Sequence, residues 1–125
     1  MIVVFQRVAE ARVRVDGEVV GEIGHGALLL ACALAGDGEG EVSWLADKVV
    51  DLRVFADDVG KSNLSLLDVG GEALVVSQFT LAADWRKGRR PSYLRAAEPA
   101  RAAELVEHLA GGLARRGVPV AQGRF

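Results

Sequence analysis

The chain has 125 residues, half of them apolar, with three prolines, one cysteine and a formal net charge of −2 at neutral pH. This length and apolar content exclude a disordered tail and favour one compact domain, residues 1–125, over two. The lone cysteine excludes an intrachain disulfide, and the small net charge by itself selects no class of partner.

The longest apolar stretch runs from Ala27 to Ala35 and contains Cys32. It is too short to span a bilayer. The N-terminal sequence MIVVFQR also lacks the basic start of a signal peptide. The sequence therefore predicts a cytoplasmic protein with no membrane partner, in which Cys32 is a buried, reduced thiol.

The N-terminal part of the chain has the pattern of β-strands. Residues 2–8 and 11–15 run apolar or alternate, and Asp16-Gly17 separates two β-rich arms, which predicts a hairpin with a type I′ turn. Residues 25–34 predict a fully buried strand, and the glycines of residues 36–40 predict a loop.

Two segments have the period of amphipathic helices. From Val42 onward, apolar residues recur at steps of three and four, through Val49, while charged residues fill the other face. Residues 98–117 predict the second helix, with Pro99 near its first turn and Gly117 just past its end.

The remaining segments complete the predicted order. Residues 53–55 predict a short strand, 57–63 a turn, 70–81 a strand, 84–93 an extended loop and 118–120 a last strand. The order β-β-β-α-β-β-α-β predicts antiparallel hairpins with two covering helices, an α+β architecture.

The sequence lacks several common catalytic motifs, and this narrows the reactions that it could catalyse. His25 stands in a Gly-His-Gly turn and His108 midway along the second predicted helix, where a surface position is expected, and neither has the sequence context of a catalytic triad. Metal-binding motifs, glycine-rich phosphate loops and paired carboxylates at metal spacing are absent from the sequence. An enzyme with this sequence is predicted to need no metal and no cofactor, and to lack a conventional acid/base pair.

The segment Ser77-Gln78-Phe79-Thr80 places two hydroxyls and an amide in an apolar strand. On a strand, Gln78 and Thr80 share one face and could form a polar floor beside free backbone N–H groups. Such donors stabilise the oxyanion that forms when an ester carbonyl is attacked. The alternative is an ordinary strand threonine with a glutamine at the rim, and the pattern alone leaves both open.

Four cations, Arg86, Lys87, Arg89 and Arg90, fall within five residues. Loop cations are usually solvated or pin the loop to acidic neighbours. The alternative is contact with phosphate, which gives salt-dependent affinity without sequence readout. The pattern leaves these two interpretations open.

Longer stretches resemble one family. VVSQFTLAADWRKGRRPSY, QRVAEARVRVDGEVVGEIGHG and RVFADDVGKSN resemble the D-aminoacyl-tRNA deacylases, and the resemblance extends from the first strand to the closing QGRF. It implies a homodimer whose fold is a mostly antiparallel, β-barrel-like sheet with two covering helices. It also implies hydrolysis of the ester that joins a D-amino acid, or glycine mischarged on tRNA-Ala, to tRNA, a step of chiral proofreading in translation.

The resemblance also implies roles for particular residues. The SQFT segment lines the family's pocket for the amino acid and terminal adenosine, where a ribose hydroxyl assists the attacking water and backbone amides hold the carbonyl. Two sets of site residues follow: Ser77, Gln78, Phe79 and Thr80 as catalytic residues, and Arg7, Arg86, Lys87, Arg89 and Arg90 as substrate-binding residues.

The sequence departs from the family pattern in places. The family carries a Gly-Pro segment after QGRF that screens chirality in the partner's pocket, and the sequence as given stops at Phe125. Ser62, Trp85 and Tyr93 differ from the usual residues, which at the position of Trp85 are smaller and polar. These three changes are local. The missing Gly-Pro segment leads to the expectation of weak discrimination between D and L substrates, and leaves open a weak or inactive tRNA-binding dimer as the alternative.

Overall fold

The central element of the fold is a four-stranded sheet. A computed structural model of the chain describes residues 1–124, and Phe125 lies outside the described residues. The strand order is β1-β4-β7-β8. The strands are β1 (Ile2–Val8), β4 (Gly26–Cys32), β7 (Glu72–Ser77) and β8 (Val120–Gln122).

The sheet is mixed. The pair β1 and β4 is antiparallel, whereas β4 and β7, and β7 and β8, are parallel. The two parallel pairs arise because α1 and α2 carry the chain back across the sheet between strands. The α+β class with two covering helices is confirmed, and antiparallel pairing holds for the other three strand pairs. The sheet does not close into a barrel over residues 1–124.

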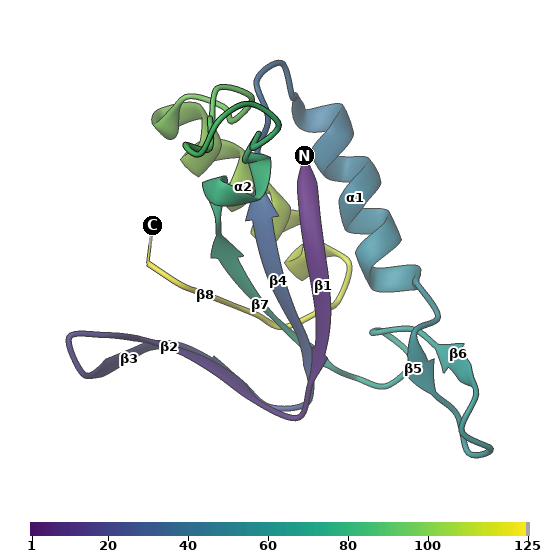
Figure 1. Cartoon of the computed structure of the whole chain (residues 1–125). Coiled ribbons are helices and arrows are strands. Elements are labelled where there is room, and N and C mark those ends of the chain that lie inside the picture. The colour runs from purple at the N-terminus through teal and green to yellow at the C-terminus, as the bar shows by residue number, and fades with distance from the viewer. Residues whose placement is uncertain (125) are drawn as a thin grey trace.

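The hairpin β2 (Ala11–Val15) and β3 (Glu18–Ile23) confirms the predicted turn. Asp16 and Gly17 have φ angles of 52° and 82°, as a type I′ turn requires. The short hairpin β5 (Phe55–Ala56) and β6 (Ser62–Leu64) lies elsewhere, near the end of α1 (Figure 1).

Capping residues stand at the N-terminus of α1 and at both ends of α2. Helix α1 spans Glu39–Asp51, and the Glu41 carboxylate accepts a hydrogen bond of 2.9 Å from the Gly38 N–H. Helix α2 spans Pro99–Arg115; its N-cap is Glu98, and Gly117 follows its end with a φ of 97°.

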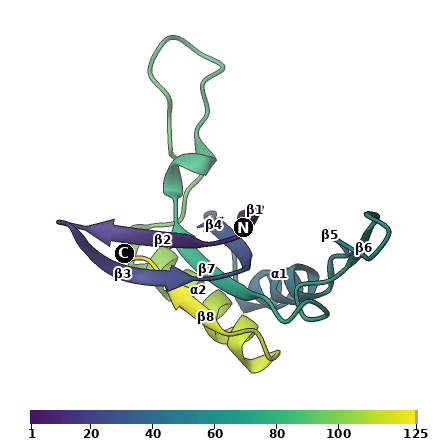
Figure 2. The same cartoon turned by 90° about the horizontal axis from the view of Figure 1, so that it is seen from below.

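The helices and the β2–β3 hairpin cover different faces of β7. Ala73 and Val75 belong to the main core, which also contains fully buried leucines of α2. Leu74 is also fully buried but points the other way, where Gly21 of β3 lies against it. A Cβ atom on Gly21 would stand 2.2 Å from the Gln122 carbonyl oxygen, so only glycine allows this approach. This crossing over β7 and β8 gives the fold its barrel-like character (Figure 2).

The observed order differs from the predicted one in three places. Four strands precede α1 instead of three, and residues 62–64, predicted as part of a turn, form β6 opposite β5. The predicted strand over 70–81 ends at Ser77. Within residues 1–124, neither helix combines the length and apolar composition needed to cross a membrane.

Candidate active site

The strand β7 ends where its neighbour ends. Gln78 N–H donates to the Ala31 carbonyl oxygen at 2.8 Å, and Ala31 is the last residue of β4 that pairs with β7. The chain then turns into a short 3-10 helix, η1 (Phe79–Ala82). The predicted alternation of faces through Thr80 is therefore wrong, because the strand geometry that it requires stops at Ser77.

The turn nevertheless brings the predicted polar pair together. The Gln78 side-chain amide donates a hydrogen bond to the Thr80 hydroxyl, and both residues are half-buried. The Phe79 and Thr80 backbone N–H groups precede the first hydrogen bond of the 3-10 turn, which Leu81 N–H makes to the Gln78 carbonyl oxygen. Within residues 1–124 neither N–H has a hydrogen-bond acceptor.

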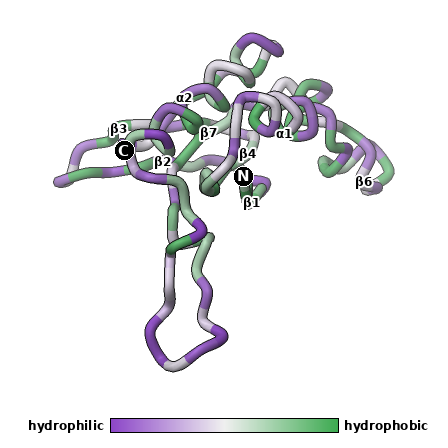
Figure 3. The backbone as a smooth tube through the Cα atoms, turned by 90° about the horizontal axis from the view of Figure 1, so that it is seen from above, coloured by the Kyte–Doolittle hydropathy of each residue, from purple (hydrophilic) through white to green (hydrophobic). Residues whose placement is uncertain are grey.

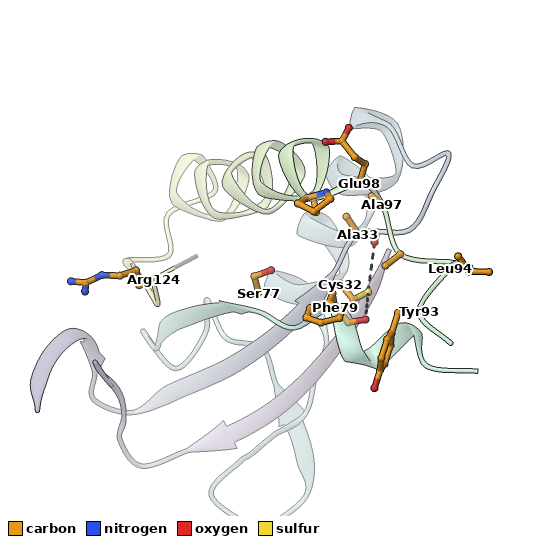
Figure 4. A pocket seen from close by; sticks show the side chains of 12 residues that line it. Cys32, Ala33, Ser77, Phe79, Tyr93, Leu94, Ala97, Glu98 and Arg124 are labelled. Atoms are coloured by element: carbon orange, nitrogen blue, oxygen red, sulfur yellow. Dashed lines mark hydrogen bonds between the residues drawn. The ribbon is translucent and has the colours of Figure 1, made fainter. Parts of the chain in front are cut away.

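A cavity of about 620 Å³ lies beside this turn (Figure 4). Ser77 and Phe79 contribute to its wall, whereas Gln78 and Thr80 lie outside its lining. The Phe79 and Tyr93 rings meet edge to face with centroids 5.3 Å apart. The lining residues are Cys32, Ala33, Ser77, Phe79, Tyr93, Leu94, Ala96, Ala97, Glu98, Pro99, Ala102 and Arg124.

The wall opposite the turn is the segment that leads into α2. Ala35 N–H donates to the Arg95 carbonyl oxygen at 2.8 Å, and Ala97 N–H donates to that of Ala33 at 2.9 Å. These two bonds hold residues 93–97 against the chain that follows β4. No sequence pattern indicated this wall, because small apolar residues in a loop carry no signal for a binding site.

Cys32 lies at the floor of the cavity. It is 1% exposed, and its Sγ lies 3.6 Å from the carbonyl oxygens of both Ala33 and Phe79 (Figure 4). Burial raises the pKa of this thiol, so it stays protonated and uncharged at neutral pH. The predicted buried thiol is confirmed, and the structure adds that it contributes to the cavity wall.

Charged groups stand only at the rim of this cavity. Glu98 caps α2, with its carboxylate accepting a 3.3 Å hydrogen bond from Ala100 N–H, and Arg124 lies at the far side from the aromatic pair (Figure 4). No sequence pattern indicated a role for either residue. A mostly apolar cavity of this size with a few polar groups suits a small organic ligand or the end of a larger one.

The predicted cluster of four cations, residues 86–90, lies on a loop that projects from the body of the protein (Figure 2). Asp84 and Ser92 pair at its base with backbone hydrogen bonds of 2.7 and 2.8 Å, and Gly88 has a φ of 69°. Arg86 is held at this base by two side-chain hydrogen bonds to Asp84, of 3.0 and 2.9 Å. These bonds lower the Asp84 pKa to about 2.

The other three cations of the loop, Lys87, Arg89 and Arg90, are exposed. Among the described residues none of them forms a salt bridge. The outer part of the loop is accordingly the hydrophilic part of the projection in Figure 3. The structure thus divides the predicted cluster into one arginine bound to its neighbour and three cations facing solvent.

Arg7 lies at the other end of the sheet. Ser77 is paired with Ala31, which is paired with Val3, four residues from Arg7 along β1. The Arg7 guanidinium donates to the Val54 carbonyl oxygen at 2.9 Å. Within one chain, the structure therefore does not bring Arg7 together with the SQFT segment.

The two histidines lie apart from the cavity lining. His25 packs edge to face against Phe55 with ring centroids 5.5 Å apart. The His108 side chain is 39% exposed and lies 3.2 Å from Glu39 of α1, as expected for a surface position on a helix. In the described part of the chain, no group of three side chains is arranged to hold a metal ion.

Comparison with known proteins identifies the family. The family model D-Tyr-tRNA(Tyr) deacylase matches residues 4–125. A D-aminoacyl-tRNA deacylase of Ruegeria pomeroyi is 55% identical over 100% of this chain and 86% of its own length. One of Roseiflexus castenholzii is 58% identical over 100% of this chain and 80% of its own length.

Two solved structures have a similar fold. A structure named c-Myc DNA Unwinding Element Binding Protein has a TM-score of 0.91 and 33% identity, over 98% of this chain and 84% of that one. A probable eukaryotic D-amino acid tRNA deacylase shares the fold, with a TM-score of 0.80 at 18% identity over 93% of this chain and 68% of that one. The chain belongs to the D-Tyr-tRNA(Tyr) deacylase family.

Proposed function

We propose that this protein hydrolyses the ester bond between a D-amino acid and tRNA, releasing the amino acid and a tRNA with free terminal hydroxyls. The observation that carries this proposal is the cavity at the end of β7, whose wall includes Ser77 and Phe79 of the segment that resembles the family's pocket. Its volume of about 620 Å³ lies within the range of sites for small molecules. The names of the sequence relatives support the same reaction.

The chemistry of the cavity favours catalysis without a protein base. Cys32, the buried thiol, is protonated at neutral pH, because burial raises its pKa. The proposed base is therefore on the substrate: the ribose hydroxyl beside the ester assists a water molecule in attacking the carbonyl carbon. Water adds its oxygen to that carbon, the C–O bond to the ribose breaks, and the ribose oxygen takes up a proton.

The proposed oxyanion donors are the backbone N–H groups of Phe79, which lines the cavity, and of Thr80, which follows it on the same turn. Each lacks an acceptor within residues 1–124. One donor of this kind contributes about 3 kcal/mol to stabilising the transition state. The hydrogen bond from Gln78 to Thr80 fixes the turn that presents these amides, so we assign Gln78 and Thr80 a positioning role. This role replaces the polar floor expected from the sequence.

The loop cations are the proposed contacts to tRNA phosphates. Lys87, Arg89 and Arg90 are exposed, and the loop that carries them leads at Tyr93 into the cavity wall, which supports contact with the acceptor end of the RNA. Arg86 is already bound to Asp84 and contributes less. An enzyme of translational proofreading acts where aminoacyl-tRNA is used, so a cytoplasmic location follows from the proposal.

A homodimer is part of the proposal. Strand β1 is an edge strand of the central sheet, and Val4 on it is 41% exposed. An apolar edge strand with free backbone groups favours pairing with a second copy. The same pairing is the proposed route by which Arg7 reaches a substrate, since in its own chain Arg7 lies at the far end of the sheet from Ser77.

A second candidate is a tRNA-binding dimer that is weakly active or inactive. Among the described residues, the ionised side chains of the cavity wall are Glu98 and Arg124 at its rim, which favours this candidate, as does the nucleic-acid-binding name of one solved relative. Single-turnover hydrolysis of D-tyrosyl-tRNA and L-tyrosyl-tRNA by the same preparation separates the two candidates. The deacylase is expected to release D-tyrosine, and glycine from glycyl-tRNA-Ala, well above the uncatalysed rate. Binding of tRNA without release would establish the second candidate.

A further inference from the structure

Trp85 is a large apolar side chain that the fold leaves mostly exposed to solvent. It is 75% exposed, against 56% for Phe79 and 37% for Tyr93. It directly follows Asp84, whose backbone pairs with Ser92 at the base of the projecting loop. An indole left in water contributes little to stability and leaves its ring open to a ligand.

The pairing at the loop base sets Trp85 between the cavity and the loop cations. Tyr93 follows Ser92 toward the cavity, and Trp85 follows Asp84 toward the tip of the loop. Beyond Trp85 come the solvent-facing cations Lys87, Arg89 and Arg90. A path from the cavity along the loop therefore meets the Phe79–Tyr93 pair, then Trp85, then positive charge.

One ligand matches this order of groups. Proteins hold single-stranded nucleic acid with exposed aromatic rings, on which bases stack, beside cations that contact the backbone. A second copy of this chain offers neither a polyanion nor a row of flat bases to such a surface. In the proposed reaction, the terminal adenosine enters the cavity, and the unpaired nucleotides before it leave along this path.

We infer that Trp85 is a stacking platform for a base of the unpaired 3′ end of tRNA, one or two nucleotides before the terminal adenosine. The inference rests on the proposed function, because that function places the terminal adenosine in the cavity. Stacking on the departing RNA is the same before and during the reaction. Trp85 therefore sets affinity and leaves the chemical step unchanged.

The two tryptophans of the chain provide a direct measurement. Trp44 lies on α1, is 60% exposed and carries Lys48 over its ring at 5.5 Å. Trp44→Phe leaves Trp85 as the only tryptophan. Its fluorescence is expected to be quenched by an RNA hairpin with a four-nucleotide 3′ overhang, and not by the same hairpin with a blunt end.

Substitution separates stacking from a structural role. Trp85→Ala is expected to weaken binding of the overhang hairpin about 5- to 100-fold, and Trp85→Phe less, because a smaller ring still stacks. Trp44→Ala is the matched control and should bind like the parent. The single-turnover rate at saturating D-tyrosyl-tRNA should stay within about twofold in all three variants.

The outcomes distinguish this inference from the proposed function. Quenching by the overhang in a protein that does not deacylate would overturn the function and leave the stacking site standing. Deacylation by the parent with unchanged affinity in Trp85→Ala would overturn the stacking site alone. A sedimentation shift in Trp85→Ala with unchanged RNA affinity would also overturn it, and would assign Trp85 to a second copy of the chain.

Discussion

The central sheet ends in two different ways. At one end, Gly26 of β4 lies so close to β7 that a Cβ atom would stand 1.9 Å from the Glu72 carbonyl oxygen. At the other end, β7 leaves β4 after Gln78, and the cavity opens beside Cys32 and Phe79. The same two parallel strands therefore make close backbone contact at one end and diverge at the other. Within residues 1–124, the Phe79 and Thr80 backbone N–H groups at this diverging end have no backbone partner.

The largest effect is expected at the close-contact end. Gly26→Ala forces its new methyl group against backbone atoms that no side-chain rotation can move. We expect a loss of about 3 kcal/mol in the free energy of unfolding and a fall of about 10 °C in Tm.

The control is Gly40→Ala in α1, where a Cβ atom would meet nothing within 4 Å. Alanine favours a helix over glycine by about 1 kcal/mol, so this variant should be as stable as the parent or slightly more so. Equal losses in the two variants, measured by thermal and urea unfolding, would contradict the close contact at Gly26.

A substitution at the diverging end is expected to change the rate of hydrolysis more than the stability of the fold. Thr80→Ala removes the acceptor of the Gln78 side-chain hydrogen bond. We expect the single-turnover rate with D-tyrosyl-tRNA to fall about tenfold, the equivalent of one hydrogen bond, with a small change in Tm. Thr80→Ser keeps the hydroxyl and should retain most of the rate. A large fall in Tm with an unchanged rate would make Thr80 purely structural.

Sequence patterns predicted the regular part of this comparison well. Asp16-Gly17, Pro99 and Gly117 located a turn and both ends of α2, because each acts through its own backbone preference. The end of β7 could not be located in this way. The apolar residues continue through Phe79 and Leu81, and what stops the strand is the end of its partner β4, a tertiary fact.

The candidate site was also predicted only in part, because local sequence patterns do not encode tertiary pairing. The segment Ser77 to Thr80 was assigned to the site as a whole, and of its four residues Ser77 and Phe79 line the cavity, whereas Gln78 and Thr80 do not. The separation of Arg7 from Ser77 depends on strand order and register, which no local pattern encodes.

The basic loop beside the diverging end should affect binding. Arg89→Gln with Arg90→Gln should weaken tRNA binding and lower the slope of log affinity against log salt by about 0.8 for each phosphate that the loop no longer neutralises. Arg101→Gln with Arg115→Gln removes the same charge from α2 and serves as the control. A slope equal in the loop variant and the parent would mean that these arginines are only solvated.

The smallest effect is expected at the loop base. The Asp84 pKa lies at about 2 instead of 3.8, chiefly because of the hydrogen bonds from the Arg86 side chain. A lowered folded-state pKa means that this ion pair is fully formed above the ordinary pKa and is lost as the pH falls from about 4 through 2. Carboxyl NMR shifts of Asp84 should titrate near pH 2, and in Arg86→Gln at a higher pH that stays below the ordinary value, because the backbone N–H of residue 86 still donates to Asp84. An unchanged midpoint in Arg86→Gln would contradict the assigned cause.

The central claim is that the protein positions the ester and the RNA supplies the assisting hydroxyl. Its most direct test is single-turnover hydrolysis of D-tyrosyl-tRNA ending in adenosine, compared with the same tRNA ending in 2′-deoxyadenosine. Binding should be equal, and the deoxy substrate should react at least about a hundredfold more slowly, as expected when an assisting proton-transfer group is removed. Equal rates for the two substrates would contradict the account and assign the catalysis to a side chain of the protein.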